Sequence, residues 1–138
     1  MKHAIHKARQ GGSMLIEALV SLLIFSIGVL SLIGMQATAI KQVNDAKFRS
    51  DASFLANQVI GEMWVNRTNL AAYAYAGGQV PAVLGNWIAD VQSALPGADV
   101  NPPTIALGAG NVVTVTVSWQ PPNTPTPHKH LVVATINN

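Results

Sequence analysis

A single carboxylate, Glu17, stands at the start of a long apolar stretch, five residues after Gly12. No Asp, Glu, Lys or Arg occurs between residues 18 and 40. A run of about 20 apolar residues is long enough to cross a bilayer as a helix. An ionised carboxylate beside hydrocarbon is costly unless a partner compensates it, which makes such a residue a functional candidate. The chemistry that we expect of Glu17 is charge pairing with a cation on another group.

The remaining residues with chemical potential form no catalytic pattern. His128 and His130 flank Lys129 on one side of an extended segment. Two imidazoles can begin a metal site, but no third ligand is evident nearby, so we predict a solvated loop end and no metal. The chain lacks cysteine, which excludes zinc–thiolate sites, disulfides and thiol nucleophiles. We find no nucleotide-binding loop and no paired carboxylates, and expect Asp90 and Asp99 to be exposed. The sequence predicts neither an enzyme nor a cofactor.

Composition points toward a membrane. Of 138 residues, 49% are hydrophobic and only 10% are charged. The net charge is +2, and Lys2, Lys7 and Arg9 are concentrated at the extreme N-terminus. That distribution differs from the broad basic face of a nucleic-acid-binding domain, so we expect no direct nucleic-acid partner.

The elements that must position Glu17 begin with one long helix. Its first half is apolar all round. In its second half, apolar residues recur three and four apart, which predicts a single buried face. That face comprises Ile40, Val43, Phe48, Ala52, Leu55, Val59 and Met63. We expect the helix to fade at 66–69 and a connecting loop to follow at 70–78. Asn66-Arg67-Thr68 matches a glycosylation sequon, a triplet that is frequent by chance.

The C-terminal half changes to strand periodicity. Residues 86–95 predict a short amphipathic helix closed by Pro96-Gly97. Segments 104–107, 113–119 and 131–136 predict three strands of a small antiparallel sheet. Segment 120–127 holds four prolines and predicts an exposed loop, a candidate contact surface. We expect Trp87 and Trp119 to be core anchors and Trp64 to pack beneath the sheet. The fold class is therefore α+β, with the sheet packed on the amphipathic half of the long helix.

Three routes are open for the N-terminal segment. Basic residues ahead of an apolar helix stay in the cytoplasm, so the rest of the chain should lie across the membrane. A secretory signal cut after Ala37-Thr38-Ala39 would leave a chain starting at Ile40, although its apolar core is too long for that class. An uncleaved anchor would keep the whole segment.

The third route rests on the string Gly11-Gly12-Ser13-Met14-Leu15-Ile16-Glu17, which resembles the type IV prepilin signal. The resemblance implies that prepilin peptidase cuts between Gly12 and Ser13, leaving Glu17 as the fifth mature residue. It also implies N-terminal methylation at Ser13, where major pilins commonly carry Phe. Residues 1–12 are then a leader, 13–40 the hydrophobic transmembrane and assembly half of the helix, and 41–138 a periplasmic globular pilin domain.

Further segments resemble one group of minor pilins, the PilV family or type IV pilus modification proteins. These segments are 48–56, 62–67, the helix ending at Leu95-Pro96-Gly97, and the strand 113–119. The resemblance implies a type IV pilin-like fold and a low-abundance subunit that takes part in pilus priming and assembly, adhesion and twitching motility. Implied partners are prepilin peptidase, the major pilin, other minor pilins and the inner-membrane assembly platform. Implied locations are the bacterial inner membrane, with the N-terminus cytoplasmic, and then the pilus.

The resemblance gives Glu17 a partner. A helix starting at Ser13 carries a terminal ammonium, about four unpaired N–H groups and the positive end of the helix dipole. In a bundle of such helices, the carboxylate of one subunit can neutralise the ammonium of its neighbour and so set the register. Two other machines share this architecture, a type II secretion system with minor pseudopilins and a competence pilus. A membrane-anchored enzyme is a third alternative, for which the chain offers no catalytic cluster.

Overall fold

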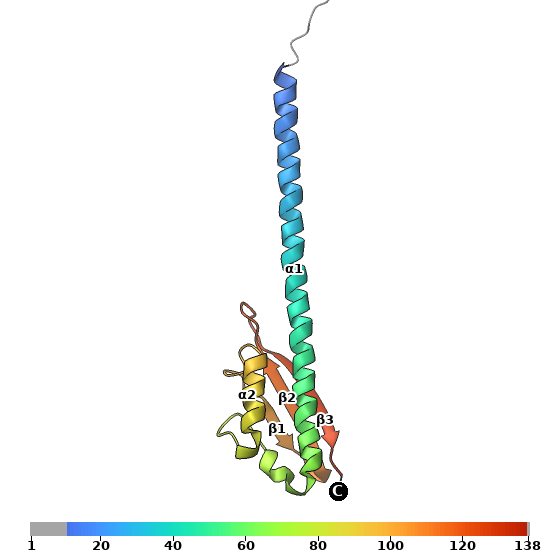
Figure 1. The fold of residues 1–138 in the computed structure, drawn as a ribbon, viewed down its shortest axis with the longest axis vertical. Helices are drawn as coiled ribbons and strands as arrows, with labels where there is room; N and C mark the ends of the chain where they lie inside the picture. The colour runs from blue at the N-terminus through green and yellow to red at the C-terminus, as the bar shows by residue number, and fades with distance from the viewer. Residues whose placement is uncertain (1–10, 138) are drawn as a thin grey trace, which may run out of the picture. The chain divides into compact units, whose positions relative to one another are not determined.

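The computed structural model describes residues 11–137, and its first element is the helix α1, Gly11–Val65 (Figure 1). The contacts divide the chain between Gln42 and Val43.

In the first part, residues 12–42 of α1 expose every side chain. This stretch is long and apolar enough to cross a membrane. Three hydroxyls within it donate hydrogen bonds to carbonyls four residues earlier: Ser26 to Leu22 at 2.7 Å, Ser31 to Ile27 at 2.9 Å and Thr38 to Gly34 at 3.1 Å. These hydroxyls are satisfied within the helix, which suits an apolar surrounding.

In the second part, the continuation of α1 supplies one side of the core. The buried residues recur three and four apart, as predicted, and are Ala52, Leu55, Ala56, Val59, Ile60 and Met63. The buried face begins later than predicted. Phe48 packs at its margin, whereas Ile40 is exposed and Val43 is 68% exposed. The apolar spacing continues through Ile40 and Val43, but both side chains are exposed in the described structure.

After α1 the chain turns through a 3-10 helix, η1, Arg67–Tyr73, where we predicted a loop from residue 70. Leu70 and Tyr73 are buried, because residues three apart share one side of a 3-10 helix. The Asn66 amide nitrogen donates to the Tyr73 hydroxyl at 2.8 Å. This hydrogen bond ties the end of α1 to the turn that follows.

The short helix α2, Gly85–Ala94, follows a further 3-10 turn, η2, Ala82–Leu84. It begins and ends one residue earlier than the predicted range 86–95, and the predicted burial of Trp87 is confirmed. The Trp87 indole N–H donates to the Leu55 carbonyl of α1 at 2.8 Å in the buried core. A buried indole N–H requires such a partner, so this bond fixes α2 against α1. Trp64 is 42% exposed, and the prediction that it packs beneath the sheet is wrong.

Three strands form the sheet: β1, Thr104–Leu107; β2, Val112–Trp119; and β3, His128–Thr135. Their order is β1-β2-β3 with both pairs antiparallel, and a 3-10 turn, η3, Ala109–Asn111, joins β1 to β2. The predicted alternation along β2 is confirmed as far as Val117, with Val113, Val115 and Val117 buried, whereas Ser118 is buried as well. β3 begins three residues earlier than predicted, because His128 pairs with Trp119 and His130 with Val117.

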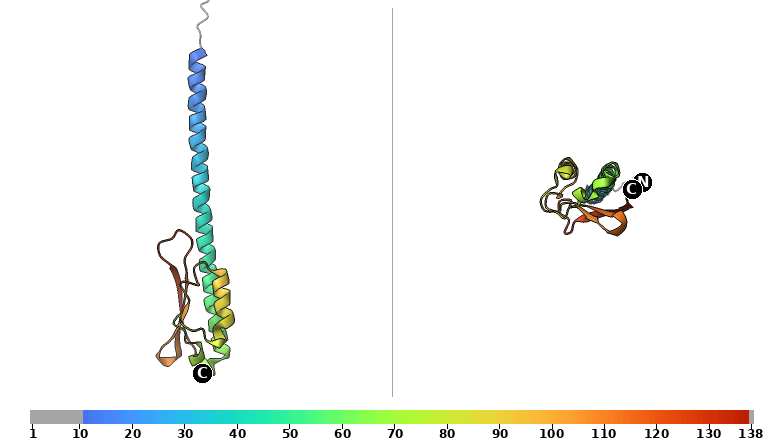
Figure 2. Two further views of the ribbon diagram at one scale, coloured as in Figure 1. Left: turned by 90° about the vertical axis from the view of Figure 1, so that its left-hand side faces the viewer. Right: turned by 90° about the horizontal axis from the view of Figure 1, so that it is seen from below.

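The second part has two layers. Figure 2 shows the sheet as one layer, with α2 and the Val43–Val65 stretch of α1 side by side as the other. Trp87 from α2 and Trp119 from β2 are the largest fully buried side chains. The chain is thus α+β, with a long apolar N-terminal helix and a small three-stranded antiparallel sheet.

Candidate functional site

The residues of the prepilin-like string lie in the first turns of α1. Gly12, Ser13 and Glu17 are helical and exposed. A Cβ atom added at Gly12 would meet no atom within 4 Å, and the backbone there is not in the left-handed region. Within the described residues, neither packing nor backbone geometry therefore requires glycine at position 12.

Glu17 lies one helical turn after Ser13. Residues four apart on a helix are neighbours on one face. The ion pairs within residues 11–137 are all formed by other side chains, so Glu17 has no charged partner among the described residues. Ser13 and Glu17 therefore lie on the same face of α1. A cut after Gly12 would make Ser13 the N-terminal residue, and its ammonium is a group with which the Glu17 carboxylate could pair.

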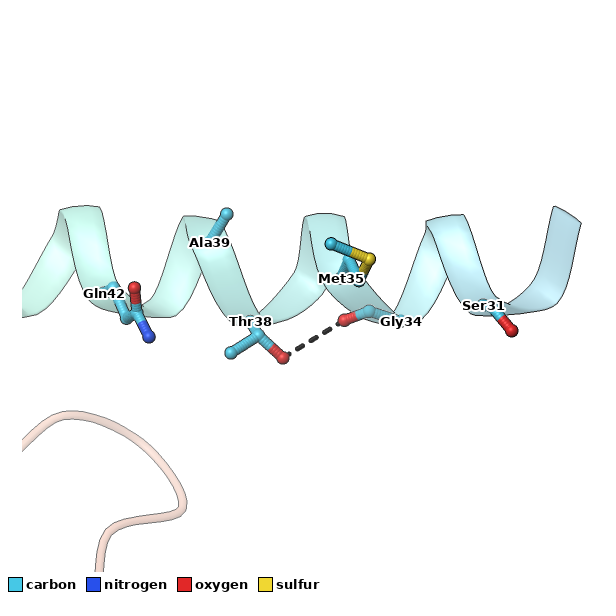
Figure 3. Close-up of a pocket in the computed structure, with 6 residues that line it drawn as sticks. All are labelled: Ser31, Gly34, Met35, Thr38, Ala39 and Gln42. Carbon is cyan, nitrogen blue, oxygen red and sulfur yellow. Dashed lines mark hydrogen bonds between the residues drawn. The ribbon is translucent and has the colours of Figure 1, made fainter. Parts of the chain in front are cut away.

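A shallow groove lies farther along the same stretch of α1 (Figure 3). It is lined by Ser31, Gly34, Met35, Thr38, Ala39 and Gln42. Gly34 makes the hollow, since its missing side chain leaves the helix backbone open. The Thr38 hydroxyl lies in the groove and donates to the Gly34 carbonyl. Small residues of this kind let another helix approach closely in a membrane.

A second polar cluster joins α1 to the sheet. His128 Nδ1 lies 3.9 Å from Asp45 Oδ1, and Arg49 Nη2 lies 3.9 Å from Asp45 Oδ2. The His128 ring stacks on Trp119 with centroids 5.6 Å apart. The prediction that the histidines form a solvated loop end is wrong, because both belong to β3 and are partly buried. Within residues 11–137, no group of three or more metal-ligating side chains could hold a metal ion.

Sequence reasoning missed the role of Asp45. In the sequence, Asp45 is one of several charged residues that lie between the apolar positions of the helix. A signal was present, since His128 and His130 have the same parity as Val132 and Ala134. Extending the strand alternation backward by three residues would have placed both imidazoles on the side of β3 that faces the helix.

The remaining candidate positions are Asp90, Asp99 and the segment 120–127, which connects Trp119 at the end of β2 to His128 at the start of β3. Asp90 and Asp99 are exposed, as predicted. In the segment 120–127, Pro122, Asn123, Pro125 and Thr126 are exposed, while the start is held by Gln120, whose backbone N–H donates to the Pro96 carbonyl at 2.7 Å. Gly97, at φ +69°, approaches this point so closely that a Cβ would lie 3.1 Å from the Gln120 Cβ.

Comparison of the chain with protein-family models, with curated proteins and with solved structures found no match. The most specific feature of the described chain is the set Gly12, Ser13 and Glu17 at the start of an exposed apolar helix.

Proposed function

We propose that this chain is a minor pilin of a bacterial type IV pilus. Prepilin peptidase cuts it after Gly12 on the cytoplasmic side of the inner membrane. The mature chain, starting at Ser13, is then drawn from the membrane into the pilus through the apolar half of α1. The pilin-like fold, with the sheet domain on the periplasmic side, belongs to this proposal.

The observation that carries the proposal is the position of Glu17 relative to Gly12 and to the helix. A carboxylate at the edge of an exposed apolar helix, without a charged partner in residues 11–137, needs a cation from elsewhere. Cleavage after Gly12 creates such a cation, the ammonium of Ser13, at the positive end of the helix dipole. A neighbouring subunit presents the same group, so each Glu17 can neutralise the terminus of the next helix.

In this proposal, lipid covers the exposed apolar surface of the helix in residues 13–40 before assembly, and other helices cover it afterwards. The partners in this proposal are prepilin peptidase, the assembly platform, the major pilin and other minor pilins. No sequence feature separates this role from that of a minor pseudopilin in a type II secretion system. Loss of twitching or adhesion in a deletion strain would favour the pilus, and loss of enzyme secretion the secretion system.

The decisive experiment is the intact mass and N-terminal sequence of the protein from its native membrane. We expect a chain that starts at Ser13, with or without one methyl group on its amine. A Gly12→Ala variant serves as the control, since it keeps the helix and removes the cleavage signal, and we expect the leader to remain on it. A wild-type chain starting at Ile40 would identify a discarded secretory signal, and an intact Met1 an uncleaved anchor; either result overturns the proposal.

A further inference from the structure

The strand β3 lies at one edge of the sheet and pairs with a neighbour on one side only. In an antiparallel ladder, alternate residues of a strand direct their backbone groups toward the neighbouring strand. The Ile136 N–H donates to the Asn111 carbonyl at 3.0 Å, in continuation of the register of β3 with β2. The even-numbered residues of β3 therefore bond to β2, and the outer edge carries the backbone groups of Lys129, Leu131, Val133 and Thr135.

This outer edge is open, whereas the opposite edge of the sheet is occupied at its centre. There, Tyr75 and Ile105 exchange two backbone hydrogen bonds, of 3.0 and 2.8 Å. Along β3, none of the outward N–H and C=O groups bonds to the backbone of another element in residues 11–137. Proteins usually protect such a row with proline, a bulge or charged side chains. β3 runs for 8 residues without proline or bulge, and Lys129 is its one Lys, Arg, Asp or Glu.

A groove beside this edge has room for the side chains of an added strand. It has a volume of about 810 Å³ and is lined by α1 residues and by His130 of β3. Ser50 and Ser53 are small, and Phe54 in the same groove is 69% exposed. The Nε2 atom of His130 is buried and has no hydrogen-bond partner. Neighbouring strands lie about 4.8 Å apart, so a fourth strand beside β3 would direct every second side chain into this groove.

The other face of the edge indicates the chemistry of such a strand. Leu131 and Val133 are 58% and 57% exposed there, and aliphatic side chains directly opposite them would be favourable. Lys129 lies on the same face and forms no ion pair within residues 11–137, so an acidic residue fits opposite it. β3 contains no Asp or Glu, so a second copy of this chain paired through the same strand would not supply that acid.

We propose that the outer edge of β3 and the groove beside it bind an extended segment of a partner protein as a fourth strand. Backbone hydrogen bonds to Leu131 and Val133 supply affinity, and alternate side chains supply selectivity. One face of the segment carries aliphatic residues and an acidic residue opposite Lys129. The other face places its side chains in the groove beside Phe54. This binding surface is independent of the pilus assignment.

The test measures binding of a synthetic peptide to the full chain in lipid nanodiscs by fluorescence anisotropy. The peptide has about ten residues, alternates valine with threonine, and carries a glutamate near each end. Val133→Pro removes one outward N–H, and the bonds between β2 and β3 remain because Val133 does not bond to β2. Val133→Thr is the matched control, since it keeps both the N–H and a branched side chain. We expect Val133→Pro to weaken binding at least about tenfold, and Val133→Thr to weaken it less than about threefold.

A second comparison does not depend on the proline variant. Lys129→Glu and the wild type are each measured with the glutamate peptide and with a peptide that carries lysine at the same two positions. We expect the wild type to bind the glutamate peptide about threefold more tightly, and Lys129→Glu to reverse that preference.

Three results would overturn the proposal. The first is no binding of the glutamate peptide to the wild type at concentrations up to about 1 mM. The second is equal binding by Val133→Pro and Val133→Thr, or an unchanged peptide preference in Lys129→Glu, because the peptide would then bind elsewhere. The third is self-association of the wild type that Val133→Pro abolishes, which would make a second copy the occupant of the edge. Melting temperatures without peptide show whether each variant folds.

Discussion

Glu17 and Ser13 occupy the same face of α1, one turn apart, on a stretch in which every described side chain is exposed. If the chain is cut after Gly12 as proposed, the carboxylate of an isolated helix can reach its own terminal ammonium and water. Inside a bundle it can also reach the terminus of a neighbour, and only that contact depends on how the two helices are aligned. Removal of the carboxylate should therefore affect assembly rather than processing.

We predict that Glu17→Ala is cleaved after Gly12 as the wild type is, but enters fibres at least about tenfold less, since 1.4 kcal/mol of lost pairing already gives that factor. The measurement is the ratio of this subunit in sheared fibres to the amount in membranes. Glu17→Gln keeps the size of the side chain and loses its charge, and should fail equally. Ser21→Ala, one turn farther along the same face, is the control that should behave as wild type. Normal amounts of Glu17→Ala in sheared fibres would contradict the pairing role.

At the scale of elements, the alternation along the strands decides which substitutions matter. Val115 is central in β2 and fully buried, pairing with Ile105 on one side and Val132 on the other. Val133 belongs to the edge strand β3 and is 57% exposed. The same residue type thus occupies opposite faces of one sheet.

We predict that Val115→Ala lowers the free energy of unfolding by about 2 kcal/mol, through lost burial and the cavity left behind. Val133→Ala, its matched control, should change it by less than about 0.5 kcal/mol. Denaturant unfolding of the chain in mild detergent, followed by the fluorescence of buried Trp87 and Trp119, measures both. Equal losses in the two variants would mean that the outer face of the sheet is covered in solution.

The elements also show how far the sequence could be interpreted. Val113, Val115 and Val117 alternate with threonine and serine, a pattern typical of a half-buried strand. It predicted the bounds of β2 to within one residue. The start of β3 was missed, since His128, Lys129 and His130 carry no apolar signal and join the sheet only by pairing with β2. The fate of Val43 was missed for a related reason: an apolar period shows which face of a helix could be buried, while the neighbouring elements decide where burial begins.

Some residues of the candidate site could also be predicted from the sequence, and others could not. Gly12, Ser13 and Glu17 could be identified from spacing alone, because their chemistry depends on neighbouring positions in one helix. The contact of Asp45 with His128 joins residues more than 80 positions apart in the sequence. It depends on the register of β3 against β2, which no local pattern specifies.

At the scale of the whole molecule, the contacts divide the chain between Gln42 and Val43. The buried core begins at Ala52, and all of it lies on the C-terminal side of that division. The apolar half of α1 therefore contributes no buried side chain to the folded sheet domain. Its side chains are not constrained by that core and can instead contact lipid and neighbouring helices.

We predict that a fragment of residues 43–138 is soluble and unfolds cooperatively, because it keeps the entire core. A fragment of residues 57–138 is the control. It lacks Ala52, Leu55 and Ala56, together with the carbonyl that accepts the Trp87 hydrogen bond. Losses of several kcal/mol from these buried groups are comparable to the whole stability of a small domain, so this fragment should not fold. Circular dichroism during a thermal melt distinguishes the two; a melt of 43–138 without a transition would contradict the division.

The three hydroxyls of Ser26, Ser31 and Thr38 have a mechanical consequence. Each donates to a carbonyl of its own helix that the backbone ladder also uses, and such shared carbonyls favour bending of a helix. Gly28 and Gly34, which lack side chains to brace the turns, lie within the same 17 residues from Leu22 to Thr38. Under tension along its axis, α1 should therefore bend or lose helical hydrogen bonds first in this stretch, which is also the stretch most suited to lie in lipid.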